Sequence, residues 1–98
     1  MNAGEQTVFE VRLRSRRVQR ELDALQGVDY ERVMARLRAL VRDPRPRGCE
    51  KIHDSIYRVR VGDYRIVYLI DDGHRRIEVG GIRRRGERTY RRIDELFD

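Results

Sequence analysis

The fold is decided by residues 57–68, which read YRVRVGDYRIVY and describe two strands joined by a tight turn. Gly62-Asp63 is suited to a two-residue hairpin loop, and such a loop fixes which residues lie opposite each other. The predicted pairs are Val61 with Tyr64, Arg60 with Arg65, Val59 with Ile66 and Arg58 with Val67.

Side chains that alternate along these strands separate into an apolar face and an arginine face. The apolar face collects Val59, Val61, Ile66 and Tyr68, and we expect it to lie beneath helices. The arginine face, defined as Arg58, Arg60 and Arg65, puts like charges directly across the ladder. Such pairs destabilise a sheet, so the pattern favours a functional surface. The structural alternative is a solvated face whose arginines pair with Glu78, Glu87, Asp94 or Glu95.

Apolar periodicity on either side of the hairpin predicts an α+β fold in which a helical hairpin covers an antiparallel meander. The expected elements are a strand over 8–14, a helix over 16–26, a second helix from Asp29 to Val41, strands over 56–61, 64–70 and 75–82, and a short terminal helix over 89–97. We expect one domain over 1–98, with 1–6 as a flexible leader.

Asp72-Gly73 is interpreted as a second two-residue turn, which extends the register to the last strand. This turn puts Arg65 opposite Gly80. It also adds Ile82 and Arg84 to the arginine face, unless a bulge at Gly80-Gly81 shifts the phase. We expect the two glycines to let a backbone approach the arginines closely.

Charge and composition indicate a polyanion as partner. Charged residues make up 41% of the chain and the formal net charge is +6, with Lys51 as the only lysine. Arginine stays ionised and presents a planar fork suited to phosphate. A G- and C-rich genome would also raise the arginine count, so the placement of the arginines carries more weight than their number.

Other features predict no metal site, no cofactor and no membrane segment. Cys49 is the only cysteine, so an intrachain disulfide is excluded and a cytoplasmic location is expected. His53 and His74 lack neighbours with ligand spacing, and both are predicted to be surface residues. Glu78 is a minor candidate for a general base, and a salt bridge is its expected role.

Residues 57–68, together with Ile82-Arg83-Arg84-Arg85 and Thr89-Tyr90-Arg91, resemble the signature of the RelE/ParE toxin superfamily over nearly the whole chain. The resemblance implies a RelE-like toxin of a type II toxin–antitoxin system. It further implies a metal-independent, ribosome-dependent endoribonuclease that cleaves mRNA in the ribosomal A site and inhibits translation. An acidic, RelB-like antitoxin is the implied inhibitory partner, beside the ribosome and mRNA.

The resemblance also implies roles for individual residues. Arg58 and Arg60 match two catalytic lysines, Arg65 matches a contact to the scissile phosphate, Arg84 a group that stabilises the transition state or leaving group, and Tyr90 a tyrosine near the substrate base. We therefore expect Arg60, Arg65, Arg84 and Tyr90 to be catalytic, and Arg58, Arg60, Arg83 and Arg85 to bind RNA.

Arginine at the two lysine positions is a departure from the family pattern. An arginine in a protein does not lose its proton, so neither Arg58 nor Arg60 can act as a general base. RNA supplies its own nucleophile in the ribose 2′-hydroxyl, and arginines can stabilise the charge that develops on the phosphate.

Two other functions stay open on the sequence. One is a ParE-like inhibitor of DNA gyrase that has no nuclease activity. The other is a module that binds RNA or the ribosome without chemistry. The short helical hairpin and the filled arginine and tyrosine positions favour the RelE-like function.

Overall fold

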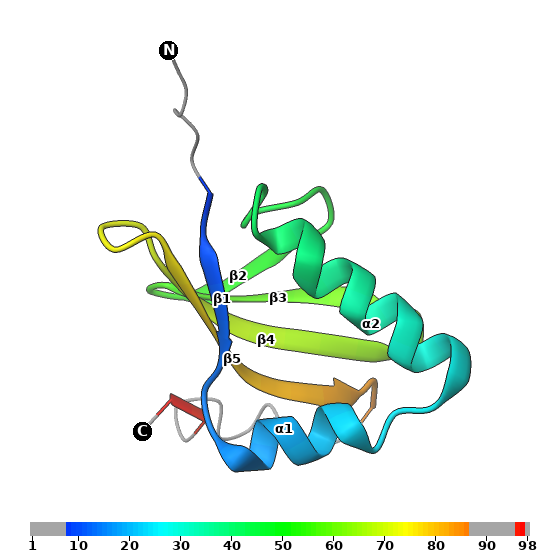
Figure 1. Cartoon of the computed structure of the whole chain (residues 1–98). Helices are drawn as coiled ribbons and strands as arrows, with labels where there is room; N and C mark the ends of the chain where they lie inside the picture. Colours follow the sequence, from blue (N-terminus) through cyan, green and yellow to red (C-terminus); the bar gives the residue numbers. More distant parts are fainter. Residues whose placement is uncertain (1–7, 87–95, 98) are drawn as a thin grey trace.

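The computed structural model describes residues 8–86 and 96–97, in which a five-stranded sheet carries two helices on one face (Figure 1). The strand order is β1-β5-β4-β3-β2, and every neighbouring pair is antiparallel except β1 and β5, which run parallel. The elements are β1 (Glu10–Leu13), α1 (Arg16–Asp23), α2 (Gly27–Leu40), β2 (Glu50–His53), β3 (Ile56–Val61), β4 (Tyr64–Asp71) and β5 (Arg76–Arg84).

The predicted order of strand, helical hairpin and antiparallel meander is confirmed, with two additions. The strand β2 was not predicted, because only Ile52 within it is partly buried and its sequence carries no apolar alternation. The parallel pairing of β1 with β5 makes the sheet mixed. Most of the predicted terminal helix lies outside the described residues, which include only Leu96 and Phe97 of it.

The first helix is shorter than the sequence predicts, and the second begins earlier. α1 ends at Asp23, where we expected it to continue to residue 26, and α2 begins at Gly27, two residues before the expected cap. Gly27 has a φ of 55°, a left-handed conformation that glycine adopts readily and that turns the chain between the helices.

The predicted register between β3 and β4 is confirmed at each of its four pairs, Val61 with Tyr64, Arg60 with Arg65, Val59 with Ile66 and Arg58 with Val67. Gly62 has a φ of 60°, as a tight hairpin turn requires. A residue with a side chain would be strained at this φ. The two-residue loop therefore does fix the arrangement of this hairpin.

The predicted register between β4 and β5 is wrong, and two features account for the difference. Asp71 pairs with Arg76, so the connecting turn contains four residues where two were expected. A bulge at Gly80 then inserts one residue, because Val67 pairs with Gly81 and Tyr68 with Val79. The longer turn preserves the alternation of faces, whereas the bulge inverts it.

The inverted phase changes the environment of the residues that follow the bulge. Arg65 lies opposite Arg83 and not opposite Gly80. Ile82 joins the main core with 4% of its surface exposed, and Arg84 pairs with Tyr64, which belongs to the same apolar row. Neither Ile82 nor Arg84 therefore belongs to the arginine face.

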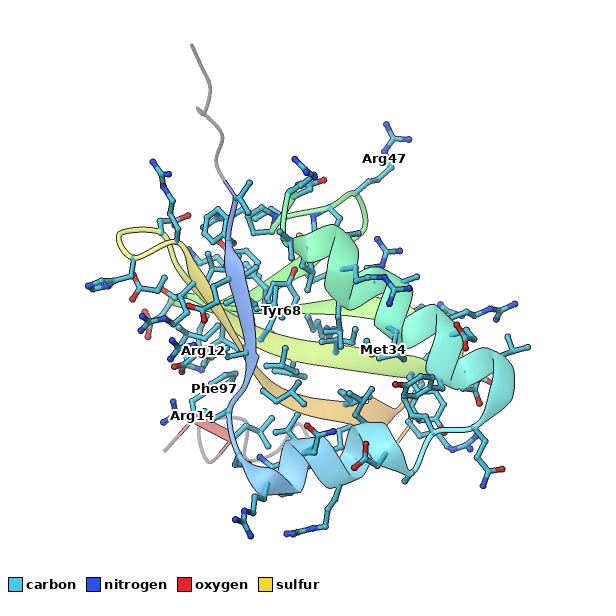
Figure 2. The ribbon with its side chains drawn as sticks, in the orientation of Figure 1. Arg12, Arg14, Met34, Arg47, Tyr68 and Phe97 are labelled. Carbon is cyan, nitrogen blue, oxygen red and sulfur yellow. The ribbon has the colours of Figure 1, made fainter. Side chains whose placement is uncertain are left out.

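The main core lies between the helices and the sheet, as expected from the apolar face. Its members from the helices include Val18, Leu22, Val33, Leu37 and Leu40, and those from the sheet include Val59, Ile66, Tyr68, Ile77 and Val79. Tyr68 is fully buried near the centre (Figure 2), and its hydroxyl donates a 2.8 Å hydrogen bond to the Pro44 carbonyl. Burial raises the pKa of this hydroxyl well above its usual value.

The face of the sheet away from the helices carries a smaller apolar cluster. Ile56, Val67 and Leu96 are buried there, with Ile52, Leu69 and Phe97 packed beside them. A Cβ built on Gly80 would lie 2.6 Å from the Phe97 ring, and one on Gly81 would lie 3.4 Å from Leu96. The two glycines thus make room for the chain's own C-terminal residues, which corrects the expectation that they leave space for a ligand backbone.

Arg45 joins the loop after α2 to the turn between β4 and β5. Its guanidinium donates to both carboxylate oxygens of Asp72, at 3.2 and 2.9 Å, and to the Tyr57 hydroxyl at 3.1 Å. The same group lies 5.0 Å from the centre of the Tyr57 ring. The charged hydrogen bonds lower the pKa of Asp72 and raise that of Arg45.

Candidate nucleic-acid interface

A group of three arginines lines a hollow at the end of β4 and β5, which we call the β5 hollow. It has a volume of about 600 Å³ and is lined by Asp63, Arg65, Arg84, Arg85 and Gly86. The backbone closes it from one side, because the Arg85 amide donates a 2.7 Å hydrogen bond to the Asp63 carbonyl. Three guanidinium groups and one carboxylate leave a net positive charge, which suits a phosphate.

Arg84 is oriented by Tyr64, its partner across β4 and β5. Its guanidinium carbon lies 5.2 Å from the centre of the Tyr64 ring, and Nη2 donates to the Tyr64 hydroxyl at 3.3 Å. A cation held over an aromatic face keeps its charge while its rotamers are restricted. The Gly80 bulge places Arg84 beside Tyr64, because without it the side chain would point to the arginine face.

Arg85 lines the β5 hollow and carries an unsatisfied donor. Its Nε is buried and finds no hydrogen-bond acceptor in the part of the chain that the structure describes. A buried donor without an acceptor costs free energy, and an anion bound in the hollow could provide the missing acceptor. Arg85 was predicted to bind RNA, and this position suits that role.

Arg60 and Arg65 form the like-charge pair that the sequence predicts. They lie directly opposite each other on β3 and β4, on the face away from the helices. Arg65 lines the β5 hollow, whereas Arg60 is exposed and lines a different hollow beside α2. The pair therefore connects two neighbouring basic regions.

Arg58 and Arg83 are engaged by carboxylates. The Arg58 Nε donates a 2.6 Å hydrogen bond to Glu50 of β2. Arg83 forms a 2.8 Å ion pair with Glu21 of α1, and only 18% of its side chain is exposed. RNA binding by these two residues stays a prediction, and the arrangement favours a structural role for each.

Glu21 explains how α1 is fixed beside the site. The strand β1 pairs with β5 only as far as Val79, and beyond that point the Ile82 amide donates to Glu21 at 2.9 Å. Arg17 completes the contact by bonding both Glu21 and the Gly80 carbonyl at 2.9 Å. Side chains of α1 thus bond two backbone groups of β5 beyond the end of its pairing with β1.

The remaining candidate residues behave as expected or lie outside the described part. Glu78 forms a 2.6 Å salt bridge with Arg14, the role that the sequence analysis expected. His53 and His74 are exposed, and a hydrogen bond from His74 lowers the pKa of Asp71. Tyr90 lies outside the described residues, so its role stays a prediction.

Three residues near the site were missed by the sequence analysis. Tyr64 was predicted only as the cross-strand partner of Val61, although it also orients Arg84. Arg32 and Arg36 of α2 line the hollow beside Arg60, and their spacing of four residues on one helix was the available signal.

Among the described residues, no cluster of three or more acidic, histidine or cysteine side chains could hold a metal ion.

Residues 13–89 match the sequence family described as the ParE toxin of type II toxin–antitoxin system, parDE. The chain belongs to this family. Within the wider RelE/ParE superfamily, it is 53% identical over 38 residues to Toxin RelE of Mycobacterium tuberculosis strain H37Rv. That match spans 39% of this chain and 38% of the length of that toxin.

Solved RelE structures share the fold of this RelE/ParE chain. RelE in the archaeal RelE–RelB complex from Pyrococcus horikoshii has a TM-score of 0.75 at 25% identity, covering 82% of this chain and 98% of that one. A mutant of Escherichia coli RelE in the free state also has a TM-score of 0.75, at 16% identity, covering 93% of this chain and 99% of that one.

No helix in the described ranges is both long enough and apolar enough to cross a membrane.

Proposed function

We propose that this RelE/ParE toxin is a ribosome-dependent endoribonuclease that cleaves mRNA in the ribosomal A site and so inhibits translation in the cytoplasm. The observation that carries the proposal is the β5 hollow, where Arg65, Arg84 and Arg85 converge and Tyr64 orients one of them. The likeness to RelE structures and to a stretch of Toxin RelE supports the same conclusion.

The proposed cleavage is an internal transesterification of the RNA. The ribose 2′-oxygen attacks the adjacent phosphorus, and the bond from phosphorus to the 5′-oxygen breaks. The products are a 2′,3′-cyclic phosphate and a 5′-hydroxyl. Arg65 and Arg84 stabilise the negative charge that develops on the phosphate, which is commonly the largest contribution to such catalysis. Arg60 and Arg85 add positive charge that attracts the RNA.

The attacking 2′-hydroxyl loses its proton to water, and the leaving 5′-oxygen takes up a proton from water. Neither Arg58 nor Arg60 can accept a proton, because an arginine stays ionised. Tyr90 is proposed to contact a nucleobase of the substrate next to the cleaved bond. The ribosome positions the mRNA for attack. We therefore expect a slower reaction than one that has a dedicated lysine base.

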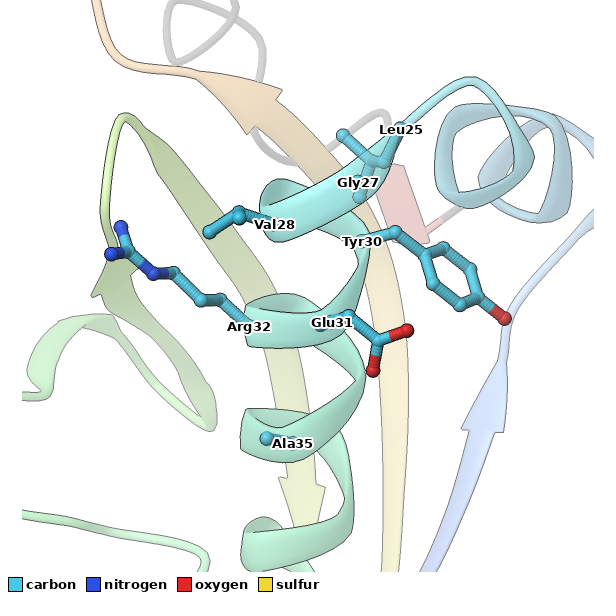
Figure 3. A pocket seen from close by; sticks show the side chains of 7 residues that line it. All are labelled: Leu25, Gly27, Val28, Tyr30, Glu31, Arg32 and Ala35. Atoms are coloured by element: carbon cyan, nitrogen blue, oxygen red, sulfur yellow. The ribbon is translucent and has the colours of Figure 1, made fainter.

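An acidic antitoxin is the proposed inhibitory partner. The P. horikoshii toxin was solved together with RelB, and so was its M. tuberculosis counterpart in RelBE2. The net charge of +6 attracts an acidic segment. Val28, which is 61% exposed, and Tyr30 line a hollow at the start of α2 and project to opposite sides of the helix (Figure 3). Both side chains offer apolar contacts to a protein partner.

A second candidate function is inhibition of DNA gyrase without cleavage of nucleic acid. The matching family is described as the ParE toxin, and both Arg58 and Arg83 are engaged by carboxylates. This function would depend on protein contacts and not on the β5 hollow.

One experiment separates the candidates. Purified protein is added to a translation extract and, in parallel, to DNA gyrase with relaxed plasmid. Codon-positioned cuts in ribosome-bound mRNA support the proposed nuclease. Loss of supercoiling with intact mRNA overturns it in favour of the gyrase inhibitor, and binding to ribosomes with intact mRNA and active gyrase indicates a binding module.

A further inference from the structure

A second basic hollow lies between α2 and the end of β3, on the other side of the β3–β4 turn from the β5 hollow. We call it the α2 hollow, and it has a volume of about 410 Å³. Arg32 and Arg36 reach it from α2, and Arg60 reaches it from β3. Figure 3 shows Arg32 extending from the helix toward the β3–β4 hairpin, and its Nη1 lies 3.4 Å from the position of a Cβ on Gly62.

The charge in the α2 hollow is not neutralised within the described part of the chain. None of the described residues that line it carries a carboxylate, and Arg32, Arg36 and Arg60 form no ion pair over residues 8–86 and 96–97. Many other arginines do have a carboxylate partner. They include Arg12, Arg14, Arg17, Arg45, Arg58 and Arg83.

The shape of the α2 hollow follows from small residues and an uncovered strand edge. Ala35 and Ala39 line the helix side and leave the space between the arginines open. On the sheet side, β2 pairs only with Ile56–Arg58, so the last three residues of β3 have no neighbouring strand there. Like charges four residues apart destabilise a helix slightly, so Arg32 and Arg36 are not placed for the stability of α2.

The two hollows adjoin through the like-charge pair on the sheet. Arg60 of the α2 hollow lies directly opposite Arg65 of the β5 hollow. The turn residues Gly62 and Asp63 are adjacent in the chain, and each lines one of the hollows. Positive charge therefore continues across the β3–β4 turn from one hollow to the other.

We propose that the α2 hollow binds a backbone phosphate of RNA, separate from the phosphate that reacts in the β5 hollow. This inference rests on the proposed function for the identity of the nucleic acid. The guanidinium groups of Arg32 and Arg36 offer paired donors that match phosphate oxygens, and Arg60 adds positive charge beside them. The RNA then crosses the β3–β4 turn and is held on both sides of it.

An acidic protein segment is the competing occupant, and the lining of the hollow disfavours it. A stable protein contact needs exposed apolar or aromatic anchors at its centre. The exposed Val28 and Tyr30 line the neighbouring hollow at the start of α2 and not this one. The α2 hollow offers alanines and guanidinium groups, which suit a phosphate backbone.

The test measures binding of a fluorescently labelled single-stranded RNA by anisotropy over a range of salt concentrations. The variants are Arg36→Ala and Arg32→Ala, and the matched control is Arg38→Ala, an exposed arginine of the same helix that does not line the hollow. We expect each test variant to weaken binding about threefold or more at low salt, and to reduce the slope of log K against log salt by about 0.7. The control should change the affinity much less.

Equal losses in Arg36→Ala and Arg38→Ala would overturn the inference, since binding would then depend on overall charge alone. Unchanged RNA binding with weaker binding of an acidic antitoxin segment would also overturn it and assign the hollow to a protein. The failure of the proposed function is seen separately, as intact mRNA in the translation extract with the wild-type protein. Circular dichroism of each variant shows whether it is folded.

Discussion

Phe97 packs against Gly80 so closely that any side chain at position 80 would overlap its ring, since a Cβ there would lie 2.6 Å from the ring. Arg14 supports this contact, because its Nη2 donates a 2.6 Å hydrogen bond to the Phe97 carbonyl (Figure 2). The Gly80 bulge, which inverts the alternation of faces along β5, is therefore also the position against which Phe97 packs.

Replacing Gly80 with alanine should displace Phe97 and lower the free energy of unfolding. We expect a loss of about 1–3 kcal/mol, the usual cost of overpacking. Urea denaturation measures it. Gly81→Ala is the matched control, because its Cβ would lie 3.4 Å from Leu96 and should be tolerated better. If Phe97→Ala does not reduce the effect of Gly80→Ala in the double variant, the two residues are not coupled and the explanation is wrong.

Replacing Arg84 with alanine should slow the chemical step of the proposed nuclease. Loss of one preorganised group that stabilises charge typically lowers the rate by about 10²-fold or more. Single-turnover cleavage of ribosome-bound mRNA measures this rate, and ribosome binding should change little.

Tyr64→Phe tests how Arg84 is positioned. The variant keeps the ring beneath the guanidinium but removes the 3.3 Å hydrogen bond from Arg84. We expect a smaller loss than in Arg84→Ala. A folded Arg84→Ala protein that cleaves at the wild-type rate would remove Arg84 from the catalytic group and leave the β5 hollow as a docking surface.

Tyr68→Phe should lower the free energy of unfolding through one buried hydrogen bond. The hydroxyl donates to the Pro44 carbonyl at 2.8 Å, and phenylalanine leaves that acceptor without its donor. The expected loss is about 1–2 kcal/mol. Tyr57→Phe is a useful comparison because the Tyr57 hydroxyl accepts a hydrogen bond from Arg45 on the surface. Equal losses of unfolding free energy in the two variants would show that burial of the Tyr68 hydrogen bond does not make it more stabilising than the exposed one.

Stability should fall in acid because Asp72 is held ionised by Arg45. The folded pKa of Asp72 is lowered from 3.8, so the unfolded chain takes up a proton more readily than the folded one. The contribution is fully present above pH 3.8 and is lost as the pH falls through the folded pKa. Urea midpoints measured between pH 7 and pH 2 should drop less steeply for Asp72→Asn. Parallel pH curves for the two proteins would show that this pair does not matter.

The sequence predicts the hairpin at residues 57–68 well because a two-residue loop leaves one register compatible with the apolar alternation. The same argument fails at β5, since neither a four-residue turn nor a bulge has a distinct pattern in the sequence. Gly80-Gly81 marked where a bulge could occur but not that one did. Consequently Arg65 is correctly placed on the arginine face, whereas Arg84 is not.

Long-range partners account for the other differences at the site. The carboxylates that engage Arg58 and Arg83 come from β2 and α1, far away in the sequence. No local pattern indicates that Glu21 reaches the open edge of β5. The lack of an ion pair at Arg32 and Arg36 within residues 8–86 and 96–97 becomes evident only when the positions of the carboxylates in those ranges are known.

The parallel pairing of β1 with β5 has a consequence for how the chain is made. The first strand of the described chain, Glu10–Leu13, has as its only partner the last strand, Arg76–Arg84. A growing chain emerges N-terminus first, so β1 has no neighbour to pair with until most of the protein has been synthesised. Pairing over so long a separation is also intrinsically slow. The β5 hollow includes Arg84, Arg85 and Gly86, so it can form only after nearly all of the described chain has been synthesised.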